Sequence, residues 1–173
     1  IYLFGALAMS FLCSVLEAVL LSTPSSFIRM KESEGNKTAI QLQEYKNNID
    51  RPVAAILSLN TVAHTIGAAG VGSESTKIFG EAYFGIISAV LTLLILIFSE
   101  IIPKTIGASY WRQLAMPCTG IIRVLIVVTW PLVWLSEFIT RGFTPSGKQV
   151  SVSREEINAM VKIGAAEGIF QEK

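Results

Sequence analysis

The chain has 173 residues, of which 51% are hydrophobic and 16% are charged, and its formal net charge is +1. Soluble domains carry roughly 25% charged residues, so this composition and a mean hydropathy of +0.55 exclude a disordered chain and disfavour a soluble domain. The near-zero charge balance offers no basic surface for nucleic acid. Cys13 and Cys118 form neither a zinc-binding spacing nor a disulfide framework, and we expect both to be buried thiols.

Three apolar segments are long enough to cross a bilayer, which takes about 20 mostly apolar residues. They are 1–22, 52–73 and 82–99, and the only charge within them is Glu17. The first segment has no basic region before it and no cleavage site, so we interpret it as a membrane helix rather than a secretory signal.

A fourth apolar segment, 113–140, is interrupted by three residues: Pro117, Arg123 and Pro131. Its longest uncharged stretch, 124–136, is short for a span and favours an interfacial or re-entrant helix. Trp130 and Trp134 lie one helical turn apart, as is typical of side chains at the level of the lipid headgroups. The alternative is a short fourth span in which Arg123 snorkels to the interface.

The loops predict the orientation. The loop at 23–51 carries five basic residues: Arg29, Lys31, Lys37, Lys46 and Arg51. The loop at 74–81 carries only Lys77, so the positive-inside rule places the first loop and the C-terminus in the cytoplasm and the N-terminus outside. We expect a polar surface helix at 38–50, a turn-rich linker at 142–150, and a further helix that opens at Ser153 with a capping box.

Polar residues within the spans point to an ion site, because ionisable groups there are costly and usually mark ion pathways. Ser14 and Glu17 share one face of the first helix, and Asn60 and His64 share one face of the second. Glu100 closes the third segment and is followed by Ile101, Ile102, Pro103 and Lys104.

Pro103 cannot donate a backbone hydrogen bond and its ring clashes with the carbonyl of Ser99, so we expect a kink with freed carbonyls beside Glu100. Carboxylate, amide, hydroxyl and carbonyl oxygens together suit Mg²⁺ or Ca²⁺.

Each of these residues also has a structural explanation. Ser14 can bond its own helix, Asn60 can join two helices, and Glu17 can pair with Lys104 instead of an ion. His64 is typical of a hydrogen-bonded packing residue. The chain contains no HExxH, GxSxG or CxxC motif and no nucleophile paired with a carboxylate, so we predict neither an enzyme nor catalytic or cofactor-binding residues.

Three stretches, FLCSVLEAVLLS, LSLNTVAHTIGAA and IFSEIIPKTIGA, resemble the signature stretches of the CorC/CNNM (cyclin M) family, in the family's order and in three different spans. The pattern FxEIxPKT combined with the preceding Asn-Thr pair is the most specific part. The tail SREEINAMVKIGAAEGIFQEK is similar to the acidic helical link before the family's cytoplasmic CBS domains. The chain departs from the family at His64, where relatives often have a second asparagine, and at Cys13-Ser14-Val15, which replaces a smaller Ser-Gly pattern.

The resemblance implies an all-α membrane protein with three transmembrane helices, a juxtamembrane interfacial belt helix and a cytoplasmic helical segment. We expect a transmembrane ion-transport domain at 1–141 with the belt at 119–140. Residues 142–173 are expected to form a linker and helix leading to CBS domains.

The resemblance implies a homodimeric transporter of the plasma (inner) membrane that exports Mg²⁺ in exchange for Na⁺ by alternating access. Mg²⁺ is then the transported substrate and Na⁺ the coupling ion. Its ion site maps to Ser14, Asn60 and Glu100, completed by backbone carbonyls. The alternative is a non-transporting scaffold or Mg²⁺ sensor that regulates a partner.

Overall fold

The computed structural model describes residues 2–141, and within that range the chain is helical, with short turns and no strand. The elements in chain order are α1 (Tyr2–Ser22), α2 (Ser25–Ser33), α3 (Lys37–Asn47), α4 (Asp50–Phe79), the 3₁₀-helix η1 (Glu81–Tyr83), α5 (Phe84–Leu94), the π-helix η2 (Ile95–Ile101), α6 (Ile102–Ser109), α7 (Trp111–Val128) and α8 (Trp130–Arg141). The predicted linker at 142–150 and the helix from Ser153 lie outside the described residues.

Four helical stretches are long and apolar enough to cross a membrane: Tyr2–Ser22, Asp50–Phe79, Glu81–Ser109 and Trp111–Val128. The first two contain the predicted segments 1–22, apart from its first residue, and 52–73. The third extends past the predicted end at residue 99, because the chain stays helical through Glu100 and Pro103. The expected fold class, an all-α membrane protein, is confirmed.

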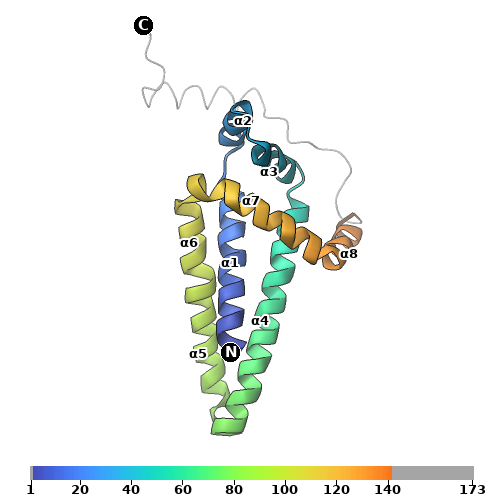
Figure 1. Ribbon diagram of the computed structural model, residues 1–173. Coiled ribbons are helices and arrows are strands. Elements are labelled where there is room, and N and C mark those ends of the chain that lie inside the picture. The colour runs from blue at the N-terminus through green and yellow to red at the C-terminus, as the bar shows by residue number, and fades with distance from the viewer. Residues whose placement is uncertain (1, 142–173) are drawn as a thin grey trace, which may run out of the picture. The chain divides into compact units, whose positions relative to one another are not determined.

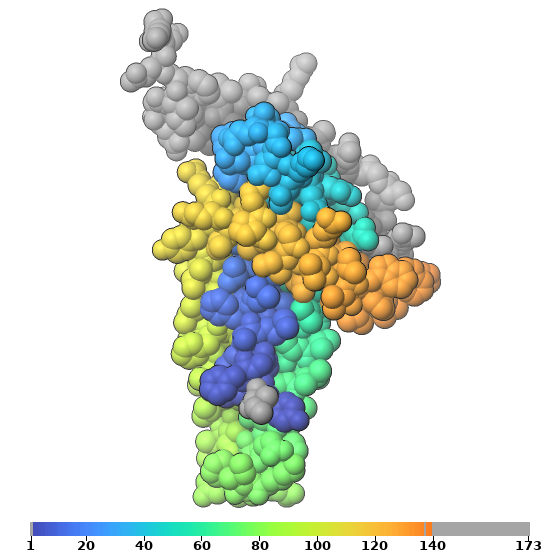
Figure 2. All heavy atoms as spheres, viewed as in Figure 1, coloured from blue at the N-terminus to red at the C-terminus, as the bar shows by residue number. Residues whose placement is uncertain are grey.

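Helix α1 lies at the centre of this arrangement and packs against α4, α6, η2 and α7. Figure 1 shows α1, α4 and the α5–α6 rod side by side, with α7 crossing them near the end occupied by α2 and α3. In Figure 2 the side chains of α7 lie over that end of α1. The crosswise course of α7 is the one expected of a belt helix, although its length and hydropathy alone would also allow a span.

The predicted belt at 119–140 differs in detail from the observed helices. It is not one helix, because α7 ends at Val128 and α8 begins at Trp130. Thr129 adopts φ −93° and ψ 13°, and its hydroxyl donates to the carbonyl of Leu125 at 2.7 Å. Pro131, which has no backbone N–H, falls in the first turn of α8, where such a group needs no helical partner.

Gly35 and Asn36 set the end of α2 and the start of α3 in the polar loop. Gly35 follows α2 with φ 81° and donates its N–H to the carbonyl of Glu32 at 2.9 Å, as at many helix C-termini. The side chain of Asn36 then accepts from the N–H of Thr38 at 2.9 Å and caps α3. The predicted helix at 38–50 is therefore present, one residue earlier and shorter, whereas α2 was not predicted.

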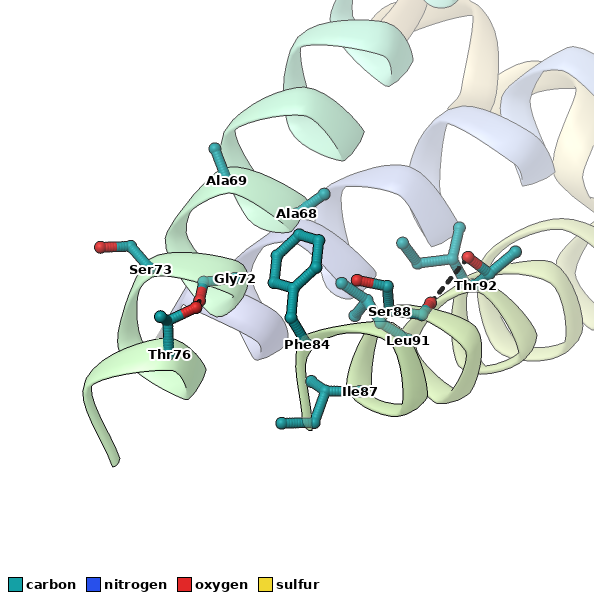
Figure 3. Close-up of a pocket in the computed structure, with 11 residues that line it drawn as sticks. Ala68, Ala69, Gly72, Ser73, Thr76, Phe84, Ile87, Ser88, Leu91 and Thr92 are labelled. Atoms are coloured by element: carbon teal, nitrogen blue, oxygen red, sulfur yellow. Dashed lines mark hydrogen bonds between the residues drawn. The ribbon is translucent and has the colours of Figure 1, made fainter. Parts of the chain in front are cut away.

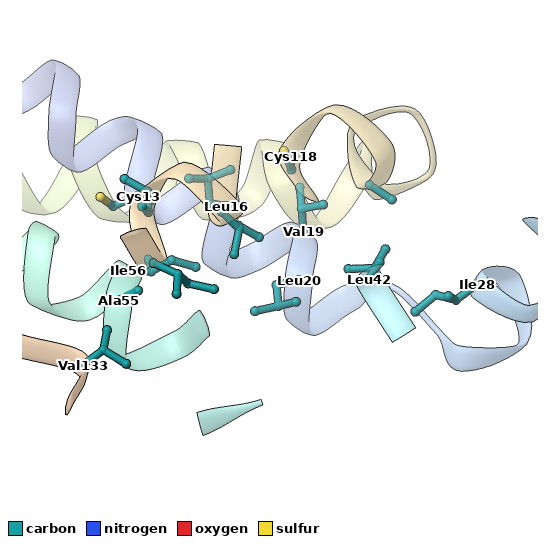
Figure 4. Packing of buried hydrophobic residues seen from close by; sticks show 14 of the residues in the cluster. Cys13, Leu16, Val19, Leu20, Ile28, Leu42, Ala55, Ile56, Cys118 and Val133 are labelled. Carbon is teal, nitrogen blue, oxygen red and sulfur yellow. The ribbon is translucent and has the colours of Figure 1, made fainter. Parts of the chain in front are cut away.

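A buried apolar cluster forms where α7 crosses the bundle. Leu16 and Leu20 of α1, Ile56 of α4 and Ile122 of α7 are all almost completely buried there. Figure 4 shows Leu16, Leu20 and Ile56 together with Ile28 of α2, Leu42 of α3 and both cysteines. The expectation that Cys13 and Cys118 are buried thiols is confirmed.

Helix α6 approaches α1 closely at Gly107. A Cβ at this position would lie 2.8 Å from the Cβ of Ala18 and 2.8 Å from the carbonyl oxygen of Val15. Real Cβ atoms do not come so close to backbone, so only glycine lets the two helices approach to this distance. The approach matters because Lys104 lies on the preceding turn of α6.

We expect Gly107→Ala to lower the free energy of unfolding by about 1–3 kcal/mol, because α6 must move away from α1 to admit the methyl group. Gly85→Ala is the matched control, because a Cβ at Gly85 would meet nothing within 4 Å. The control should unfold at or slightly above the parent's temperature in detergent. Equal melting temperatures for the two variants would contradict the tight α1–α6 contact.

The belt assignment predicts that cysteines introduced at Ser33 and Gly142 react with a membrane-impermeant thiol reagent from the same side. A cysteine at Glu81, in the turn between α4 and α5, should react from the opposite side. The background is a variant in which the buried Cys13 and Cys118 are replaced by alanine. Labelling of Ser33 and Gly142 positions from opposite sides would make α7 a fourth span.

Candidate cation site

The three predicted ligands lie on three elements that pack together. Ser14 is on α1, Asn60 on α4 and Glu100 on the π-helix η2, and α1 packs against both of the others. The amide Nδ2 of Asn60 donates to Oε1 of Glu100 at 3.0 Å, which joins α4 to η2. Ser14 is completely buried, and Asn60 is 9% exposed.

Lys104 joins the carboxylates of two helices. Its Nζ lies 2.9 Å from Oε2 of Glu100, one turn earlier on the same rod, and 3.3 Å from Oε2 of Glu17 on α1. The alternative that Glu17 pairs with Lys104 is therefore present in the structure.

A second link from α1 reaches Glu100 through His64. Oγ of Ser10 and Nε2 of His64 are hydrogen-bonded at 2.6 Å, and the same Nε2 lies 3.9 Å from Oε1 of Glu100. Ser10, Ser14 and Glu17 follow one another at helical spacing on one face of α1. Ser10 and Glu17 thus lie one turn on either side of Ser14. Ser10 reaches Glu100 through His64, and Glu17 reaches it through Lys104.

Two buried oxygens at this site, Oγ of Ser14 and Oδ1 of Asn60, have no hydrogen-bond partner among the described residues. Several membrane-helix hydroxyls behave differently: those of Thr61, Thr65 and Thr119 each donate to the carbonyl four residues earlier. The explanation that Ser14 bonds its own helix is therefore wrong. An unsatisfied buried polar atom costs about 1–3 kcal/mol, and in native proteins it calls for an explanation such as an ion.

The helix that carries Glu100 is interrupted by the π-helix rather than by a break at Pro103. The N–H of Ile102 bonds to the carbonyl of Ile97, five residues back. Pro103, in the first turn of α6, cannot donate to Ser99. The predicted kink thus takes the form of a widened turn that ends just before the proline. Such π-turns occur frequently at functional sites, since they displace a side chain from the regular helical register.

The chain matches one family along its whole length: the family model for the cyclin M transmembrane N-terminal domain covers residues 1–173. The chain belongs to the CNNM family. UPF0053 protein sll1254 of Synechocystis is 36% identical over 169 residues, which is 98% of this chain and 49% of that protein. The UPF0053 inner membrane protein YfjD of Escherichia coli is 29% identical over 141 residues, 78% of this chain and 33% of its own length.

A third relative carries a functional name. The polyamine export protein of Haemophilus influenzae is 24% identical over 147 residues, which is 76% of this chain and 34% of that protein. The chain thus spans about half or less of the length of these three relatives. CNNM membership, the membrane-spanning helices and the inner membrane relative together make it an integral membrane protein.

The candidate site around Glu100 does not coincide with the cavity of about 550 Å³ between α4 and α5. Figure 3 shows apolar groups such as Ala68, Phe84 and Leu91 around it. The hydroxyl of Thr92 donates to the carbonyl of Ser88, and no ionisable side chain lines the cavity. Among the described residues, no three His, Cys, Asp or Glu side chains gather as a metal cluster. A cation at the candidate site would combine the Glu100 carboxylate with serine, asparagine and backbone oxygens.

Sequence reasoning missed Ser10 and gave Ser99, which it noted beside Glu100, no role. Ser10 lies four residues before Ser14, so the sequence predicts that both lie on one face of a helix. The sequence does not predict the hydrogen bond between Ser10 and His64, because the two residues lie on different helices. Oγ of Ser99 donates to the carbonyl of Leu7 at 3.4 Å and so ties η2 to α1. The expectation that His64 is a hydrogen-bonded packing residue is met by its bond to Ser10.

The two serines of α1 should respond oppositely to alanine substitution. Ser14→Ala removes an unpaired buried oxygen, so the free energy of unfolding without added metal should stay the same or rise by up to about 1 kcal/mol. Ser10→Ala breaks the bond to His64 and should lower it by about 1 kcal/mol. Thermal unfolding in detergent at fixed pH measures both, and a larger loss in Ser14→Ala would show that its hydroxyl has a structural partner.

Proposed function

We propose that this CNNM domain carries Mg²⁺ across the membrane, with Ser14, Asn60 and Glu100 as side-chain ligands. The observation that carries the proposal is the pair of buried, unpartnered oxygens of Ser14 and Asn60. Asn60 also donates to Glu100, and the neighbours of Ser14 on α1 reach Glu100 through His64 and Lys104. Oxygen atoms without donors in a protein interior suit a hard cation.

The donor set fits the coordination that Mg²⁺ requires. The ion takes six oxygens at about 2.0–2.1 Å in near-octahedral geometry, and it usually keeps several waters. One carboxylate and two neutral side-chain oxygens leave positions for water and for carbonyls near η2. A single carboxylate ligand also favours release, since a transported ion must leave its site as readily as it enters.

The position of the site supports transport rather than a static structural role. Ser14 and Asn60 lie within the membrane-spanning helices, and Glu100 lies on an interrupted helix, as is typical of ion sites in transporters. Alternating access, exchange for Na⁺ and a homodimeric assembly are part of the proposal through the family resemblance. So is the orientation, with α2 and α3 in the cytoplasm.

Export of an organic polycation is the second candidate. The polyamine export protein of H. influenzae is a relative of this chain. Lys104 also places a primary ammonium between Glu17 and Glu100, which is the contact that one end of a polyamine would make.

Flux in proteoliposomes separates the candidates. Vesicles holding the chain are loaded with Mg²⁺ and diluted into Na⁺ or choline buffer, and spermidine-loaded vesicles are run in parallel. The proposal predicts Mg²⁺ efflux that is faster with external Na⁺ than with choline. Spermidine flux without Mg²⁺ flux would favour the second candidate, whereas Mg²⁺ binding without any flux would favour the sensor or scaffold alternative.

Substitutions at the site should impair Mg²⁺ handling without unfolding the protein. Glu100→Gln keeps the shape and removes the charge, so Mg²⁺ affinity should fall by about tenfold or more. Asn60→Ala removes a neutral oxygen and should weaken binding less. Both should reduce flux in proportion.

The matched control is Glu74→Gln, because Glu74 is half-exposed at the far end of α4 and pairs only with Lys77 among the described contacts. This variant should bind and carry Mg²⁺ like the parent. Parent-like binding and flux in Glu100→Gln would instead make that carboxylate structural.

A further inference from the structure

Among residues 2–141, the polar side chains found near the carboxylate of Glu100 are those of Asn60, His64 and Lys104, and each carries a hydrogen-bond donor. Oε1 accepts from Nδ2 of Asn60 at 3.0 Å and faces Nε2 of His64 at 3.9 Å. Oε2 faces the ammonium of Lys104 at 2.9 Å. Each oxygen thus already faces a donor group, and a cation that binds Glu100 shares the carboxylate with these groups.

Lys104 is the donor whose charge opposes a cation. Its ammonium lies between two carboxylates, 2.9 Å from Oε2 of Glu100 and 3.3 Å from Oε2 of Glu17. A metal dication on Glu100 would repel this ammonium across a distance of a few ångströms in surroundings less polar than water. The two positive charges therefore compete for the same carboxylate.

Lys104 is also able to leave. Its side chain is 45% exposed, whereas those of Glu17 and Glu100 are 17% and 23% exposed. A lysine has a flexible four-carbon stem, so its ammonium can move several ångströms while the backbone of α6 stays in place. Glu17 offers a second carboxylate that can retain the ammonium after it releases Glu100.

We propose that Lys104 is a built-in counter-ion that competes with the transported cation. The inference rests on the proposed function and adds a role to it. Arrival of the ion displaces the ammonium from Glu100, and departure of the ion lets the ammonium return. A carrier without its cargo then never exposes two uncompensated carboxylates to the apolar membrane interior, which would be costly.

A purely structural ion pair and a competing counter-ion predict opposite effects on cation affinity. If Lys104 only fastens α6 to α1, its loss loosens the site and weakens Mg²⁺ binding. If Lys104 competes, its loss tightens binding. The sign of the change therefore decides between the two roles.

The charge of the site has to be controlled, because Lys104→Met leaves both carboxylates unpaired and raises the net negative charge. The double variant Glu17→Gln/Lys104→Met solves this. With Glu17 and Glu100 ionised and Lys104 protonated, the parent's three groups carry one net negative charge, and Glu100 alone carries the same charge in the double variant. Tighter binding in the double variant then reports the loss of the competitor and not a change of site charge. It also carries the test if the single variant fails to fold.

The experiment is a Mg²⁺ titration of the 173-residue chain in detergent, followed by calorimetry, with MgCl₂ as the only added ligand. The dissociation constant for Mg²⁺ should fall by about fivefold or more in Lys104→Met and in the double variant. A change of about fivefold is at the lower end of the effect that one ligand of a protein has on the affinity for another. Lys104→Arg should rescue parent-like binding. Lys77→Met, which removes a lysine paired with Glu74 at the distant end of α4, should leave it unchanged.

A flux measurement adds a second readout. Lys104→Met should lower both the KM for Mg²⁺ and the maximal rate, because the carrier returns without its counter-ion. A double variant that folds and binds Mg²⁺ no more tightly than the parent overturns the competing role of Lys104. Absence of Mg²⁺ binding by the parent itself would instead overturn the proposed function on which this role rests.

Discussion

The carboxylate of Glu100 constrains how the helices pack, because a charge within a membrane-spanning helix needs polar partners, and here neighbouring helices supply them. Asn60 of α4 and Lys104 of α6 contact it directly, and Glu17 of α1 is reached through Lys104. A shift of one helix by a single turn would remove one of these contacts. The polar cluster therefore fixes the register of helices whose lipid-facing surfaces are too uniform to fix it themselves.

Apolar packing also fixes the register of the helices, at the place where α7 crosses them. Helix α7 crosses α1 and α4 and closes a cluster that includes Leu16, Ile56 and Ile122. The apolar cluster and the polar residues thus share helix α1, on which Leu16 lies between Ser14 and Glu17.

Helical spacing allowed the site to be predicted, because polar residues at three- and four-residue intervals in apolar segments must share a face. Spacing placed Ser14 with Glu17 and Asn60 with His64 on shared faces, whereas the family resemblance selected Ser14, Asn60 and Glu100 as ligands. The π-helix was not predicted, since Pro103 reveals only that one hydrogen bond is missing and not how the preceding residues pair instead. Helix α2 was also missed, because it buries little apolar surface of its own and depends on α3 to hold it.

The length of α4 has a consequence for the lipid that surrounds the protein. Its 30 residues give a rod of about 45 Å, whereas the hydrocarbon core of a typical bilayer is about 30 Å thick. The uncharged stretch between Arg51 and Glu74 spans only about 33 Å, so the last turns, with Glu74 and Lys77, extend beyond the acyl chains. In a thinner membrane α4 would have to tilt, and the angle between α4 and α1 at Asn60 would become sensitive to bilayer thickness.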